Sequence, residues 1–224
     1  MCAIFGSFDT SMFEVLYAAN KKRGNFASSV VSLSPDDQYI RKKKGNINFD
    51  KYTYEPSSNY YSGHVQAPTS ANREWHSDTS HPFESLTWLV SHNGVLTNHK
   101  KLRRKYCRFI ENNVDTAVIV NAMEHYTQKA LSDKKRVVPE KIIKSTLELL
   151  AGTFALSIIF CNTNEMFIAR SGSILHYNNK GDYSTMGGVG FKELQEGVIM
   201  KLNNKTKRWN KVSKFKSDSP FSFV

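Results

Sequence analysis

The spacing of apolar residues along the chain changes twice, and each change predicts a change in secondary structure. Residues 2–8 form a short apolar run that favours β structure, and residues 12–19 then carry apolar side chains at helical spacing. Further short apolar runs, separated by Pro, Asn, Asp and Gly, are typical of strands joined by turns. These runs cover residues 28–33, 38–42, 60–66 and 86–91.

The middle of the chain predicts helices. Asn98 can cap a short basic helix, Asp115-Thr116 precedes a second one, and a third spans about 139–150 and ends at Gly152. Three strands are then expected at 153–160, 165–169 and 174–177. The order of strands, helices and strands favours an α+β layered domain over alternating βαβ units. We expect a single domain over residues 1–224, with a mobile lysine-rich tail after about residue 203.

Composition narrows the class of protein. The chain has 224 residues, 40% of them hydrophobic, and no apolar run approaches the roughly 20 residues of a membrane-spanning helix. Three cysteines, at positions 2, 107 and 161, leave no disulfide framework, and no basic and apolar leader opens the chain. A soluble, cytoplasmic protein without membrane association is predicted.

The net charge of +11 arises from 31 Lys and Arg against 20 Asp and Glu. Such a charge attracts nucleic acid, anionic nucleotides or an acidic protein. The alternative is an ordinary solvated surface, because the charge is scattered in short runs. Only the last run interleaves aromatic residues, Trp209 and Phe215, which is a weak signal for a single-strand stacking platform.

Cys2 is the first candidate for chemistry. If Met1 is removed, Cys2 becomes the amino-terminal residue, and its α-amino group, with an ordinary pKa of about 8, can act as general base for its own thiol. One residue then supplies both nucleophile and base. The alternative is an incidental or buried thiol.

Two further segments have a structural interpretation, and one of them also has a chemical one. An Asn93-Gly94 pair after a strand usually forms a turn, but the Asn amide and the Gly N–H can also stabilise one developing oxyanion. Asp115-Thr116 is explained by helix capping alone.

Five spaced segments of the chain belong together: Cys2-Ala3-Ile4-Phe5-Gly6, Gly63-His64 with Pro68-Thr69, His81-Pro82-Phe83, His92-Asn93-Gly94 with Asn98, and Asp115-Thr116. Taken in order, these segments resemble the class II glutamine amidotransferase domain, which has the fold of the amino-terminal-nucleophile hydrolases and opens with Cys-Gly-Ile or Cys-Ala-Ile. Weaker similarity continues toward residue 199, so the resemblance covers nearly the whole chain.

The resemblance implies a four-layer αββα sandwich in which Cys2 attacks the side-chain amide of L-glutamine. It also implies that Asn93 and Gly94 form the oxyanion hole, that a γ-glutamyl thioester forms on Cys2, and that Asp115 holds the substrate ammonium. Thr69 matches a substrate-contacting position.

One position departs from the family pattern. Gln66 stands where the family usually has an Arg that binds the substrate carboxylate, so a bidentate ion pair is lost. Arg73, on the adjoining loop, is a candidate replacement. The departure keeps open a hydrolase acting on a different amide and a non-enzymatic binding protein with this fold.

The sequence contains no ATP-binding motif of an amide-forming synthetase, so the predicted partner is a separate synthetase or transferase chain that accepts ammonia. If the basic surface is functional, that partner is expected to modify a nucleotide or nucleic acid. We expect no cofactor and no metal ion, since His64, His81 and His92 lack a metal-ligand spacing. Cys107 and Cys161 are expected to be structural thiols.

Overall fold

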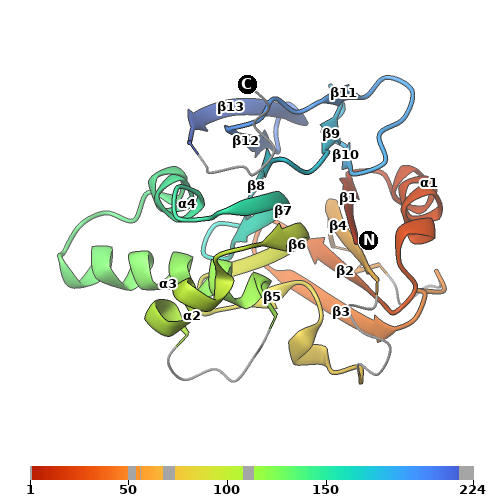
Figure 1. Ribbon diagram of the computed structural model, residues 1–224. Coiled ribbons are helices and arrows are strands. Elements are labelled where there is room, and N and C mark those ends of the chain that lie inside the picture. The colour runs from red at the N-terminus through yellow and green to blue at the C-terminus, as the bar shows by residue number, and fades with distance from the viewer. Residues whose placement is uncertain (1, 50–53, 56, 68–73, 108–113, 217–224) are drawn as a thin grey trace, which may run out of the picture.

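A computed structural model of the chain describes residues 2–49, 54–55, 57–67, 74–107 and 114–216. Over these residues, two antiparallel sheets stack face to face, and helices cover the outer face of each sheet (Figure 1). The layer order, helix, sheet, sheet, helix, confirms the predicted α+β class and αββα sandwich.

The first sheet places the amino-terminal strand in its interior. β1 pairs with β10 on one side and β4 on the other, and all five of its residues are buried. The first strand is therefore paired on both of its edges. The described strands follow the order β11-β9-β10-β1-β4-β2-β3. Their bounds are β1 (Ala3–Ser7), β2 (Ala27–Leu33), β3 (Gln38–Lys44), β4 (Tyr60–Gln66), β9 (His176–Tyr177), β10 (Tyr183–Ser184) and β11 (Lys192–Glu193).

The second sheet has the strand order β13-β12-β8-β7-β6-β5 over the described residues. β6 pairs with β7 along its whole length, from Trp88 opposite Phe160 to Leu96 opposite Gly152. The strand bounds are β5 (Phe83–Glu84), β6 (Trp88–Leu96), β7 (Gly152–Phe160), β8 (Glu165–Ser171), β12 (Val198–Asn203) and β13 (Arg208–Lys214).

The helices divide between the two outer faces. α1 packs on β1 and β4, and α3 packs on β6 and contacts both α2 and α4. Asp9 caps α1, because its carboxylate accepts a hydrogen bond of 2.8 Å from the Met12 N–H. The helix bounds are α1 (Thr10–Asn20), α2 (His99–Tyr106), α3 (Thr116–Ser132) and α4 (Pro139–Leu147), with short 3₁₀ turns at Lys21–Arg23 and Ser77–Thr79.

Three apolar clusters fill the three interfaces of the sandwich. Phe5 belongs to the cluster beneath α1, whereas its neighbour Ile4 belongs to the cluster between the sheets. The third cluster joins the second sheet to α3 and α4 through Ile119, Ile143 and Phe154. Successive residues of a strand point to opposite faces, so β1 contributes to two cores at once.

Two sequence expectations differ from the structure. α4 ends at Leu147, and Gly152 begins β7 instead of ending the helix. The strand expected at 174–177 is limited to His176–Tyr177. The lysine-rich segment after about residue 203 contains β13, whose Trp209 is buried, and Phe215 beyond it is buried too.

Candidate active site

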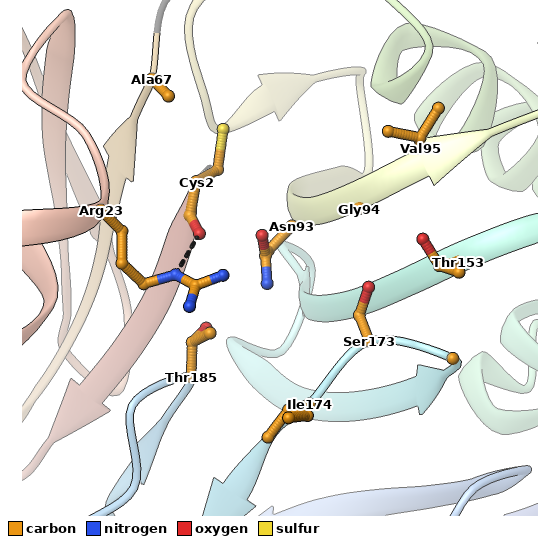
Figure 2. Close-up of a pocket in the computed structure, with 11 residues that line it drawn as sticks. Cys2, Arg23, Ala67, Asn93, Gly94, Val95, Thr153, Ser173, Ile174 and Thr185 are labelled. Atoms are coloured by element: carbon orange, nitrogen blue, oxygen red, sulfur yellow. Dashed lines mark hydrogen bonds between the residues drawn. The ribbon is translucent and has the colours of Figure 1, made fainter.

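A cavity of about 510 Å³ opens where β1 and β6 face each other across the two sheets. Cys2, Asn93 and Gly94 all line it, so the structure brings together the three residues predicted to carry the chemistry. Figure 2 shows the Cys2 thiol pointing toward Ala67, and it shows Asn93 beside Cys2. The remaining lining residues are Arg23, Ala67, Val95, Thr153, Gly172, Ser173, Ile174 and Thr185.

Strand alternation explains this meeting. On β1, Ile4 points into the core between the sheets, and Cys2 lies two residues before it, on the same face. On β6, Leu89 points into that same core, so Asn93, four residues later, also faces the first sheet. The intervening His92 faces α3 instead.

Arg23 is a site residue that the sequence analysis missed. Its Nε–H donates a hydrogen bond of 3.0 Å to the backbone carbonyl of Cys2 (Figure 2). Among the described residues that line the cavity, Arg23 carries the only formal charge. It ends the Lys21–Arg23 turn, where three consecutive basic residues gave no signal that one of them differs from the others.

Asn93 and Gly94 lie inside β6, so the alternative interpretation of this pair as a turn is wrong. Gly94 has φ +150°, and a Cβ there would lie 2.0 Å from the Thr153 carbonyl oxygen and 2.9 Å from Nε2 of His92. Only glycine fits this position without displacing its neighbours. The backbone next to Asn93 is therefore fixed by close packing rather than by a turn.

Asp115 stands just before α3, but its side chain makes no capping hydrogen bond, so capping does not explain this residue. Its Oδ2 accepts a 3.0 Å bond from the Leu96 N–H, and its Oδ1 lies 3.7 Å from Nδ1 of His92. Burial alone would raise the pKa of Asp115, but His92 and the Leu96 N–H lower it to about 2. The carboxylate is ionised at neutral pH and does not line the cavity.

The remaining predicted substrate contacts lie at the end of β4. Gln66 is the last residue of β4, on the strand face that looks toward the second sheet, and it is buried. It does not line the cavity, whereas its neighbour Ala67 does. Thr69 and Arg73 lie outside the described residues.

A buried polar group, here called the histidine cluster, consists of His64, His81, His92 and Thr116. The rings of His64 and His81 stack with centroids 3.9 Å apart. The Thr116 hydroxyl lies 2.9 Å from Nε2 of His81 and 3.1 Å from Nδ1 of His92. Nε2 of His64 lies 3.2 Å from the backbone carbonyl oxygen of His92. The cluster therefore joins β4, β6 and α3 directly beside Asn93.

Burial lowers the pKa of His64 to about 3, against an ordinary value of 6.5. Between these values the unfolded chain binds a proton at this position and the folded chain does not, so stability falls as the pH drops. The free energy of unfolding should therefore drop between pH 7 and pH 4, and replacing His64 by glutamine should make that drop smaller by up to about 3 kcal/mol. Denaturant unfolding at both pH values measures it.

The matched control for that measurement is His125→Gln, at an exposed position of α3. It should leave the difference between the two pH values unchanged. An equal pH dependence in the wild-type and His64→Gln proteins would contradict the assignment of a neutral, buried His64.

The other two cysteines do not line the cavity. Burial raises the pKa of Cys107, and burial together with Glu84 and Glu124 raises that of Cys161 to about 11. Both therefore stay protonated at neutral pH and are poor nucleophiles. The described part of the chain shows no group of three His, Cys, Asp or Glu residues placed to hold a metal ion.

Comparison with known proteins gives the family. The family model described as "Glutamine amidotransferase domain" matches residues 76–182. The glutamine–fructose-6-phosphate aminotransferases of Halalkalibacterium halodurans and Geobacillus kaustophilus are each 26% identical to the chain, over 167 and 191 residues. The chain is therefore related to the class II glutamine amidotransferase domains. The matched regions cover 71% and 78% of the chain but only 27% and 30% of these two relatives.

Solved structures of other glutamine amidotransferases share the fold. The PRPP amidotransferase from B. subtilis matches with a TM-score of 0.71 at 16% identity, over 96% of this chain and 49% of that one. A predicted glutamine amidotransferase from Pseudomonas aeruginosa matches with a TM-score of 0.51 at 11% identity, over 95% of both chains. The chain thus has the fold of the amino-terminal-nucleophile hydrolases.

Proposed function

We propose that this domain is a glutaminase that hydrolyses the side-chain amide of L-glutamine through Cys2. The observation that carries the proposal is the convergence of Cys2, Asn93 and Gly94 on one cavity. An acyl-transfer site needs a nucleophile and oxyanion donors that meet at one reacting carbon, and these three residues supply both.

The proposed reaction begins with removal of Met1, which frees the α-amino group of Cys2. This amine takes the thiol proton while sulfur bonds to the amide carbon of glutamine. The Asn93 side-chain amide and the Gly94 N–H donate to the oxyanion that forms. When the oxyanion collapses, the carbon–nitrogen bond breaks and the ammonium of Cys2 returns its proton to the leaving ammonia. Water then cleaves the γ-glutamyl thioester and releases glutamate.

Arg23 supports this chemistry through its contact with the backbone of Cys2. Its hydrogen bond to the Cys2 carbonyl fixes the terminal residue.

Substrate recognition is proposed to use Asp115 for the α-ammonium, with Thr69 and Gln66 as further contacts. Gln66 provides no charge for the α-carboxylate, so glutamine is expected to bind less tightly than it would with an Arg at this position. This departure also supports the second candidate function, hydrolysis of a different amide by the same Cys2 chemistry. An assay of ammonia release from glutamine, asparagine and N-acyl amides separates the two.

We propose that the ammonia serves a synthetase or transferase in the cytoplasm, carried on another chain. The net charge of +11 on the chain described here supports an acidic partner or one that modifies a nucleotide. The basic runs lie on separate elements, however, at β3, at α2, after α3 and along β12 and β13. None of the helices in the described ranges meets the length and hydropathy expected of a membrane span.

Covalent labelling tests the proposal. A diazoketone analogue of glutamine should add once to the protein, and intact mass should show the adduct on Cys2 of a chain that lacks Met1. Cys161→Ala should label as fully as the wild type, because the raised pKa of Cys161 keeps that thiol protonated. Labelling of Cys107 or Cys161 in place of Cys2, or labelling of a chain that retains Met1, would refute the mechanism.

A further inference from the structure

The histidine cluster lies beside the proposed oxyanion donors, yet the proposed reaction uses none of its side chains. Thr116 and His64 are almost fully buried, and His81 and His92 are only 4% and 3% exposed. Burying four polar side chains together is costly unless each is hydrogen-bonded, so the arrangement calls for an account of every proton.

When all three rings are neutral, the contacts of the cluster define one direction for its hydrogen bonds. Nε2 of His92 lies 3.4 Å from the carbonyl oxygen of Thr153, which can only accept, so Nε2 carries the proton. Nδ1 of a neutral His92 must then accept. The Thr116 hydroxyl at 3.1 Å is the donor, because the ionised Asp115 cannot donate.

The Thr116 hydroxyl therefore donates its proton in the hydrogen bond to Nδ1 of His92. Its oxygen is 3.1 Å from His92 but 3.4 Å from Asp115, which agrees with this choice. The same oxygen must therefore accept from Nε2–H of His81, 2.9 Å away. The result is a directed chain of hydrogen bonds from His81 through Thr116 and His92 to the Thr153 carbonyl.

This chain controls the backbone on both sides of Asn93. On the amino-terminal side, Nε2–H of His64 donates to the carbonyl oxygen of His92. On the carboxy-terminal side, the His92 ring and the Thr153 carbonyl pack against the Cα of Gly94, so closely that an added Cβ would clash with both. A change in the tilt of the His92 ring would therefore shift the Gly94 N–H.

We propose that the histidine cluster positions the oxyanion donors, with Thr116 as the central positioning residue that sets the tautomer and tilt of His92. The inference rests on the proposed glutaminase function for its catalytic meaning. It assigns to these four residues a role in catalysis without contact with the substrate.

The test compares three variants at two buried threonines, Thr116 and Thr127. Thr116→Val removes the hydrogen-bond donor and keeps the shape, whereas Thr116→Ser restores the hydroxyl. Thr127→Val is the matched control, because Thr127 lies on the same helix and bonds the same strand, accepting from Trp88 at 2.9 Å, but at the opposite end of β6. The two valine variants lose comparable buried hydrogen bonds.

Thr116→Val should lower kcat for glutamine hydrolysis about 10- to 100-fold with KM changed less than about two-fold, since oxyanion contacts strengthen only in the transition state. Thr116→Ser should recover most of the rate, and Thr127→Val should keep it. Alkylation of Cys2 by iodoacetamide should proceed equally fast in all four proteins, because displacement at a saturated carbon forms no oxyanion. Equal loss of kcat in both valine variants, or full activity of Thr116→Val, would overturn the proposal.

Nitrogen-15 NMR of the histidine rings separates this inference from the proposed function. In the wild type at neutral pH, His92 should carry its proton on Nε2 and leave Nδ1 bare, and His81 should carry a proton on Nε2. A proton on Nδ1 of His92 would refute the hydrogen-bond chain even in an active enzyme. If the wild type releases no ammonia from glutamine, the glutaminase proposal fails, and these tautomers alone decide the inference.

Discussion

Replacing Cys2 by alanine should lower glutamine hydrolysis by about four orders of magnitude or more, because the thiol supplies the only covalent route to the thioester. Ammonia release at saturating glutamine, followed with a coupled assay, measures the loss. Cys161→Ala is the control, since that thiol stays protonated and lies away from the cavity. Activity in Cys2→Ala above one per cent of wild type would exclude the nucleophile assigned here.

A second arm of this experiment isolates the amine from the thiol. A chain extended before Met1 by residues that resist cleavage keeps the Cys2 thiol but converts its α-amino group into an amide, which cannot accept a proton. Hydrolysis should fall nearly as far as in Cys2→Ala. An extended and fully active chain would show that some other group serves as the base.

Asn93→Ala should reduce kcat about 10²- to 10³-fold while KM stays within about two-fold of wild type, because its amide stabilises charge that exists only in the transition state. Steady-state kinetics with glutamine provides both constants. Asn121→Ala, on α3, is the matched control, since its amide bonds the Ala117 carbonyl within that helix. A rise in KM with an unchanged kcat would assign Asn93 to ground-state binding instead.

Periodicity alone predicted most of the elements, because strands and helices repeat their apolar residues every two and every 3.6 positions. Local turn chemistry was less reliable. Asn93-Gly94 has the composition of a hairpin turn but lies inside β6, since the positive φ of Gly94 is required by the approach of the Thr153 carbonyl. That contact joins residues 59 positions apart, and no window of sequence contains it.

The candidate site was predictable where a family motif marks it and unpredictable elsewhere. Cys2, Asn93 and Gly94 stand in such motifs. Arg23 acts through a hydrogen bond to a backbone carbonyl 21 residues away, and the residues next to Arg23 in the sequence do not indicate this contact. Thr116 likewise reads as a residue near a helix cap, although its hydroxyl joins two histidines from other parts of the chain.

The interior position of β1 has a consequence for the order of events during synthesis. Phe5 pairs with Ser184, and the Ile4 N–H bonds the Thr185 hydroxyl, so one side of the first strand is completed only by residues near the end of the chain. Contacts of such sequence separation form late. On the ribosome, the first strand therefore stays without its β10 partner until residue 184 has been made.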